Sequence, residues 1–297
     1  MSQALRLKLL FAILCVVWGT TWIAMKSGTV HVPPALFSGL RWSAAGLLLL
    51  AGVWWHDGRL RLPWHLAGRI FAVALLLISS NQLLMLYALR YVGSGLGAVI
   101  NSALTPLSLL GFAVAMGQDR ITRRTAFAMG LGVLGILTLF GPAAWAGRLD
   151  GLVLLGAAGI VLGTLTYSAG SVLARPLMGT MSPFLLAGLI NLAGGMLLLM
   201  GSLAFEPGAV AALDLRWGTT AWIAWLFLLG PAALGASTIF LVLVRDWGAA
   251  RAGSYAFVSP IIAVLLGLFV SGEALHAVDA IGMALMLAAA WVALRRA

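Results

Sequence analysis

Long apolar runs separated by short polar connections fill this chain. Crossing a lipid core of about 30 Å takes roughly 20 helical residues. The runs are continuous, whereas barrel strands would alternate apolar and polar residues over about ten positions. The pattern therefore predicts an all-α polytopic membrane protein. We expect ten transmembrane helices, at 9–28, 35–55, 66–89, 93–117, 124–144, 151–173, 183–204, 218–243, 250–271 and 277–294.

The two halves of the sequence match each other at their least common residues. A shift of 149 positions aligns a proline, two glycines, an aromatic residue and a basic residue in register. A second match, at an offset of 154, joins the later parts of the halves, including the prolines at 106 and 260. Each half holds five expected spans, and this odd number makes the second copy enter the membrane upside down. We therefore expect two inverted five-helix repeats, at 1–150 and 151–297. The residues that match at 149 are Trp18 with Tyr167, Lys26 with Arg175, Pro34 with Pro183, Gly39 with Gly188, and Gly46 with Gly195.

Composition excludes a water-soluble domain. Hydrophobic residues make up 62% of the chain and charged residues 9%, and the mean hydropathy is +1.07. A soluble domain of 297 residues could not cover so much apolar surface. The net charge of +10 would indicate a nucleic-acid partner only if basic residues gathered on one soluble face. They lie singly or in pairs between apolar runs, so we expect no nucleic acid.

The basic residues predict the orientation instead. With the amino terminus inside, 13 of the 18 Lys and Arg residues lie on the inner side, four lie outside, and Arg41 lies within a span. This bias follows the positive-inside rule and places both termini in the cytoplasm. Cys15 is the one cysteine and lies in the first span, so neither a disulfide nor a thiolate metal site is expected.

Several motifs resemble the EamA family of the drug/metabolite transporter superfamily. They are Trp18-Gly19-Thr20-Thr21-Trp22 with Lys26, Pro33-Pro34 and Arg41-Trp42, the fourth span with Pro106 ending in Gly117-Gln118-Asp119, and the ninth with Pro260 ending in Gly272-Glu273. The resemblance covers nearly the whole chain. It implies a ten-helix metabolite exporter of the inner membrane, similar in layout to YddG-type amino acid exporters.

Two prolines mark candidate bends. Pro106 and Pro260 each lie near the middle of a span, where proline removes a backbone hydrogen bond and clashes with the preceding turn. Either one alone could be a static kink that improves packing. Because they recur at equivalent positions, we expect them to act as hinges that gate a substrate site between the repeats.

The candidate substrate-binding residues occupy equivalent positions with different chemistry. Asn101 and Tyr255 lie five residues before the two prolines, and Trp18 and Tyr167 are large rings within the first and sixth spans. Aromatic faces bind cations or stack on planar groups. The alternative is that these rings fill the bundle core.

The third span carries the densest polar run, Ser79-Ser80-Asn81-Gln82. Amides facing lipid are costly, so this run must face protein or water. We include Asn81 among the cavity-lining residues, although hydrogen bonding between helices would explain it equally well.

Arg41 is the one basic residue well inside an expected span, and its counterpart in the second copy is Ile190. An intramembrane arginine is a candidate contact for a substrate carboxylate. Alternatively, its long side chain could reach the outer headgroups.

The eight acidic residues and the four histidines fall at span ends or in connections. A proton relay needs a buried titratable group, so we expect uncoupled alternating access or exchange. The expected protein is a monomeric exporter of small metabolites, most of all amino acids, without cofactor, metal or catalytic residues. Alternatives are a proton-coupled drug or metabolite efflux carrier, a lipid-modifying membrane enzyme, and a sensor that keeps a carrier fold.

Overall fold

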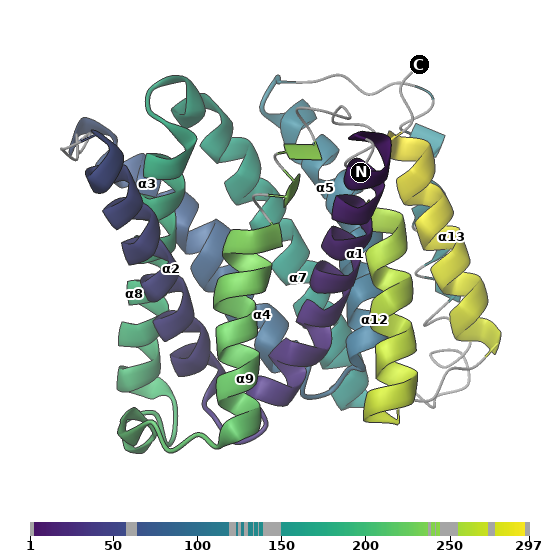
Figure 1. The fold of residues 1–297 in the computed structure, drawn as a ribbon. Coiled ribbons are helices and arrows are strands. Elements are labelled where there is room, and N and C mark those ends of the chain that lie inside the picture. Colours follow the sequence, from purple (N-terminus) through teal and green to yellow (C-terminus); the bar gives the residue numbers. More distant parts are fainter. Residues whose placement is uncertain are drawn as a thin grey trace.

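The computed structural model describes residues 3–57, 64–118, 150–236, 255–272 and 277–294, with isolated stretches between 123 and 138 and between 239 and 243. All regular elements in these ranges are helical. Figure 1 shows a bundle in which the start of α1 and the end of α13 lie at the same end.

Seven helical segments within the described ranges are long and apolar enough to cross a membrane. They are α1 (Gln3–Gly28), α2 (Pro34–Asp57), a third span from Trp64 to Ala88, α5 (Ser94–Ala115), α7 (Gly151–Ala174) with η3 (Arg175–Gly179), α8 (Pro183–Phe205), and α9 (Thr219–Phe227) with η5 (Leu228–Ala236). Two apolar helices, α12 (Tyr255–Ser271) and α13 (Ala277–Leu294), follow. The fold is therefore all-α with many apolar spans, as predicted. Most of the expected fifth helix, 124–144, lies outside the described residues, so ten helices stays a prediction.

Two spans depart from α-helical geometry, at places that match at the offset of 154: the third span, and the eighth expected span (218–243), which is described as α9 with η5. The third consists of η1 (Trp64–Leu66), α3 (Ala67–Ala74), the π-helix η2 (Leu75–Ser80) and α4 (Asn81–Ala88). In the eighth, the π-helix η5 contains Pro231. By contrast, α5 and α12 run through positions 106 and 260 as α-helix. The irregular parts of the described bundle are therefore the two π segments and not the two proline positions. A π segment shifts the hydrogen-bond register, and such segments often occur at functional sites. The hinge role of the two prolines stays a prediction.

Local capping explains where several helices begin and end. The Ser182 hydroxyl accepts a hydrogen bond from the Leu185 amide at the start of α8, where Pro183 takes the first helical position. The Asp150 carboxylate does the same for the Leu152 amide at the start of α7. At the other end, α5 and α12 are followed by Gly117 and Gly272 with φ of 67° and 63°. Such left-handed glycines terminate helices because they have no Cβ to clash.

Helices α2 and α8 lie side by side, and glycines set their separation (Figure 1). A Cβ added to Gly39 would lie 2.7 Å from the Leu199 amide nitrogen, and one added to Gly188 would lie 2.8 Å from Leu50 Cδ2. Added Cβ atoms at Gly46 and Gly195 would overlap the backbone of the opposite helix. The four glycines therefore allow two membrane helices to approach at backbone distance.

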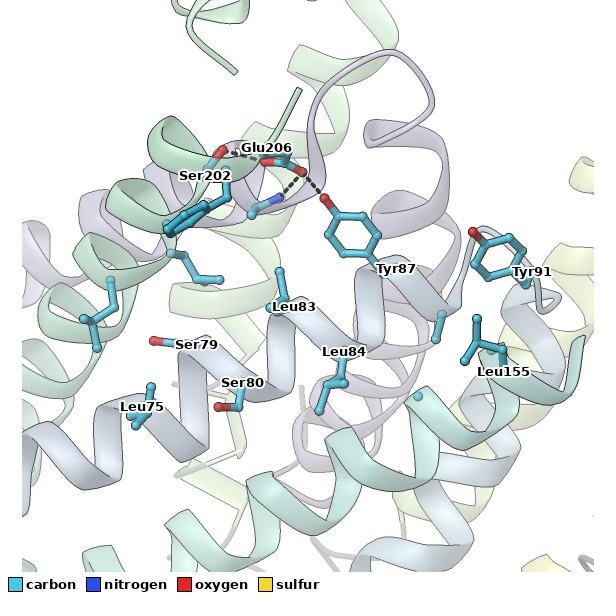
Figure 2. Close-up of a pocket in the computed structure, with 18 residues that line it drawn as sticks. Leu75, Ser79, Ser80, Leu83, Leu84, Tyr87, Tyr91, Leu155, Ser202 and Glu206 are labelled. Carbon is cyan, nitrogen blue, oxygen red and sulfur yellow. Dashed lines mark hydrogen bonds between the residues drawn. The ribbon is translucent and has the colours of Figure 1, made fainter. Parts of the chain in front are cut away.

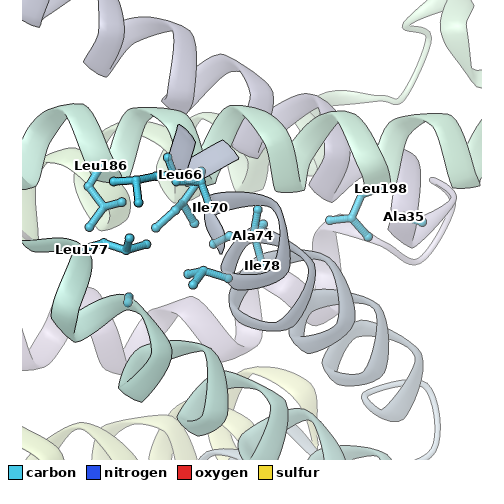
Figure 3. Close-up of a cluster of buried hydrophobic side chains, with 11 residues drawn as sticks. Ala35, Leu66, Ile70, Ala74, Ile78, Leu177, Leu186 and Leu198 are labelled. Carbon is cyan, nitrogen blue, oxygen red and sulfur yellow. The ribbon is translucent and has the colours of Figure 1, made fainter. Parts of the chain in front are cut away.

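The two halves of the chain interleave. Helix α1 packs against α12 and α9, and α7 packs against α5 and α4. One buried cluster joins the third span to α7 and α8, as Figure 3 shows for Ile70, Ile78 and Leu198. Another joins α1 and α2 to α9 and η5 through Phe37, Ala224 and neighbouring side chains. Each half thus buries apolar side chains against the other.

Candidate functional site

A chain of hydrogen bonds crosses the bundle from α2 to α7. Arg41 Nη2 donates to Gln82 Oε1 over 2.9 Å, and Gln82 Nε2 donates to Asn81 Oδ1 over 3.1 Å. Asn81 Nδ2 then donates to the carbonyl oxygen of Gly163 over 2.9 Å. Arg41 and Asn81 are buried, with 4% and 7% of their surfaces exposed. Two of the predicted site residues therefore belong to one polar network inside the membrane-spanning part.

The last member of this chain fixes the orientation of the others. A backbone carbonyl can only accept, so the Asn81 side chain must present its NH2 group to Gly163. Asn81 Oδ1 is then the acceptor for Gln82, which leaves Gln82 Oε1 facing Arg41. The Ser38 hydroxyl also donates to this oxygen, over 3.1 Å.

A third predicted residue is bonded next to this chain. Thr164, the neighbour of Gly163 in α7, donates through Oγ1 to Asn101 Oδ1 over 3.1 Å. Thr164 is fully buried, and its single hydroxyl proton is shared between Asn101 Oδ1 and the carbonyl oxygen of Ile160, which lies 2.8 Å from Oγ1. The polar side chains of α2, α4, α7 and α5 therefore meet along the flank of α7.

The predicted aromatic residues form a second group. The rings of Trp18 and Tyr255 lie 4.3 Å apart at 67°, and each also contacts Phe240, at 5.5 and 5.6 Å. Edge-to-face contacts of this kind stabilise aromatic clusters. Trp18 Nε1 donates to the carbonyl oxygen of Ala232 in η5 over 3.3 Å. The first span is thereby bonded to the π segment of the eighth.

Tyr167 joins neither group through a described hydrogen bond or ring contact. It lies three residues after Thr164, on the same side of α7. Its side chain is 40% exposed. Its assignment to the substrate site stays a prediction.

The carboxylate of Glu206 accepts hydrogen bonds from three helices at the end of the bundle opposite the start of α1. Glu206 follows the last residue of α8, and its two oxygens accept 3.1 Å hydrogen bonds from the amides of Ala35 and Leu36 in the first turn of α2. Tyr87 donates to Oε1 from the last turn of α4, and Ser202 donates to Oε2. A carboxylate at a helix N-terminus satisfies amides that otherwise lack partners and interacts favourably with the helix dipole.

A cavity of about 720 Å³ lies below this carboxylate, between α4, α7 and α8. Figure 2 shows Ser79, Ser80 and Leu84 along its wall, with Tyr87 and Glu206 at one end. Its rim includes Phe205, which is 88% exposed. None of the predicted site residues lines it.

The profile of the EamA-like transporter family matches residues 6–141 and 154–295, which is nearly all of the chain. The chain belongs to the EamA-like transporter family. It is 31% identical over 272 residues to the uncharacterized inner membrane transporter YedA of Escherichia coli K12, covering 91% of this chain and 84% of that protein. It is 27% identical over 286 residues to an uncharacterized transporter of Synechocystis, with the same coverage.

A solved crystal structure shares this EamA fold. It superimposes with a TM-score of 0.63 over 98% of both chains at 22% identity, a likeness that shows the fold alone. Together with the apolar spans, the family and its relatives establish a multi-pass transporter of the inner membrane. Within the described part of this EamA chain, no three His, Cys, Asp or Glu side chains gather as metal ligands would.

Two residues of this EamA protein make more hydrogen bonds between helices than the sequence indicated. Gln82 links Arg41 to Asn81, and its place in the run from Ser79 to Gln82 was the available signal. Glu206 was expected at a span end and does lie there, but its four donors come from α2, α4 and α8. Only the packing of these helices reveals its partners.

Proposed function

We propose that this chain exports small metabolites, amino acids being the leading class, by alternating access of two inverted repeats, 1–150 and 151–297. It acts as a monomer with both termini in the cytoplasm, and it works by exchange or by uncoupled flow down a gradient. The substrate site lies where the repeats cross, with Trp18, Asn81, Asn101, Tyr167 and Tyr255 as lining residues. The observation that carries this proposal is a two-fold relation among the contacts of α2 and α8.

These contacts occur in pairs related by the repeat. Gly39 packs on Leu199, and adding 149 to the first number and subtracting it from the second gives Gly188 and Leu50, which also pack together. Likewise, the contact of Gly46 with Leu192 becomes the contact of Gly195 with Ser43. A two-fold axis between α2 and α8 produces such reciprocal pairs.

The directions of the helices support inversion. Glu206 holds the end of α8 against the start of α2. Short connections join α1 to α2 and α7 to α8, so α1 ends at this side of the bundle and α7 at the other. The first helices of the two copies therefore run in opposite directions, as inverted repeats require.

Three of the predicted site residues take part in two helix crossings that the repeat relates in the same way. Asn101 of α5 meets Thr164 of α7, while Tyr255 of α12 meets Trp18 of α1. One crossing is polar and the other aromatic, although the helices are equivalent. A pair of unlike surfaces facing one site suits an asymmetric substrate with a polar and an apolar end, such as an amino acid.

Counterflow in proteoliposomes tests this function. Purified protein would be reconstituted into liposomes loaded with unlabelled leucine, and the entry of external radiolabelled leucine would be followed with and without an imposed pH gradient. We expect entry well above that of protein-free liposomes and no accumulation driven by the gradient. Absence of counterflow across a panel of amino acids would contradict amino acid transport, and accumulation that follows the pH gradient would contradict uncoupled flow.

A further inference from the structure

Arg41 is a buried cation whose partners are all neutral. It lies seven residues into α2, about 10 Å from the start of that helix at 1.5 Å per residue. Its described contacts are the bond to Gln82 Oε1 and the stacking of its guanidinium 4.4 Å over the Trp42 ring. No described carboxylate lies within ion-pair distance of it, and Nε is buried without an acceptor. A buried charge without a counter-ion is costly, which calls for a role.

The position of Arg41 on α2 excludes two structural roles. Gly39, Ser43 and Gly46 face α8, and Arg41 lies about 200° around the helix from Gly39, so it takes no part in that contact. Its bond to Gln82 and its burial also show that the side chain does not extend to the outer headgroups. The equivalent residue of the second copy, Ile190, is equally buried in an apolar cluster. The fold therefore accommodates an uncharged residue at this position.

We propose that Arg41 binds the carboxylate of the substrate, which makes the transported class carboxylate-bearing metabolites. Gln82 holds one side of the guanidinium through Nη2, which leaves Nε to donate to an incoming oxygen. Arginine binds carboxylates through such charge-assisted hydrogen bonds. Trp42, whose own Nε1 is also buried without an acceptor, supports the guanidinium plane.

The hydrogen-bond chain gives this site a fixed geometry. Gln82 is oriented by Asn81, and Asn81 is anchored on the backbone of α7. The guanidinium is therefore preorganised from two other helices, which reduces the entropy lost on binding. The hydrogen-bond chain ends at Gly163, next to Thr164, which is bonded to Asn101. A substrate whose carboxylate binds Arg41 would therefore lie on the side of α7 that carries the proposed site.

This inference rests on the proposed function, but ligand binding tests it separately from transport. The probes are propionate and leucine, each paired with its amide, propionamide or leucinamide, and the readout is thermal stabilisation of the purified protein in detergent. The variants are Arg41→Gln and, as a control, Arg216→Gln, which removes an exposed arginine paired with Asp214 in the connection before α9. We expect the carboxylates to stabilise wild type and Arg216→Gln at concentrations about tenfold lower than Arg41→Gln requires. The amides should not distinguish the three proteins.

An equal preference for carboxylates in wild type and Arg41→Gln would overturn the assignment, as would a wild type that binds the carboxylates no better than the amides. If Arg41→Gln does not fold, Arg41→Lys replaces it, since it keeps the charge but lacks the planar fork. We then expect weaker binding of both carboxylates, and unchanged affinity would contradict the role of the guanidinium. A wild type that binds carboxylates but shows no counterflow across the panel of amino acids would refute amino acid transport while supporting this site.

Discussion

The hydroxyl of Tyr87 lies 2.6 Å from Oε1 of Glu206, which joins the end of the third span to the end of α8. The same carboxylate caps α2, so three helices from both halves of the chain meet at one side chain. The alternating access proposed above would require this connection to break before the repeats could separate at that end.

Replacing Glu206 by alanine should therefore destabilise the protein. The change leaves the amides of Ala35 and Leu36 without acceptors, at a cost of about 2 kcal/mol. Thermal unfolding in detergent would measure the loss. Tyr87→Phe removes one of the four donors and should cost less.

Asp57→Ala is the matched control. Asp57 is the equivalent residue of the first copy, at an offset of 149, but its side chain is exposed and bonds only its neighbour His56 among described residues. We expect its unfolding temperature to stay near that of wild type. A loss as large as that of Glu206→Ala would show that the capping geometry is not what stabilises this end.

Glycine-to-alanine substitutions should lower the free energy of unfolding where α2 and α8 cross, and should not lower it elsewhere in these two helices. Gly46→Ala places a methyl group against the Leu192 backbone and should cost about 1–3 kcal/mol. Gly52→Ala, in the same helix, meets nothing within 4 Å and should be neutral or stabilising. The repeat predicts the same contrast between Gly195→Ala and Gly201→Ala, whose added Cβ atoms meet the Ser43 backbone and open space. Equal unfolding temperatures within each pair would argue against a close crossing.

Asn81→Leu should weaken carboxylate binding without touching Arg41. The substitution removes the anchor on Gly163 and frees Gln82 to rotate, so we expect the preference of wild type for propionate over propionamide to decrease several-fold. Thr166→Val is its control, because Thr166 donates to the same carbonyl but is not bonded to Gln82. If the two variants bind propionate equally well, the hydrogen-bond chain does not orient the arginine.

The spans were predictable because their signal is local. Apolar runs of membrane length gave helices whose bounds match at 151–173 and 183–204 almost to the residue. The burial of Arg41 and Asn81 in hydrogen bonds was predictable for a related reason, since they are polar side chains within such runs and lipid cannot satisfy them. Their role in binding substrate stays a prediction.

The connections between these residues were not predictable, because they depend on which helices pack together. Nothing in the sequence pairs Thr164 with Asn101 or brings Glu206 to the start of α2. The π segments at Leu75–Ser80 and Leu228–Ala236 also lack a sequence signal as clear as a proline, and only the second contains one. The sequence directed attention to Pro106 and Pro260, where the described backbone stays α-helical.

The most direct test of the account compares leucine counterflow by wild type and by the double variant Asn101→Ala, Tyr255→Ala, reconstituted at equal protein density. These substitutions remove the distinctive side chain from each of the two equivalent crossings, so we expect counterflow in wild type and a loss of about tenfold or more in the variant. The unfolding temperature of the variant in detergent would confirm that it is folded. Undiminished flux in a folded double variant would contradict the claim that substrate passes between the repeats at these crossings.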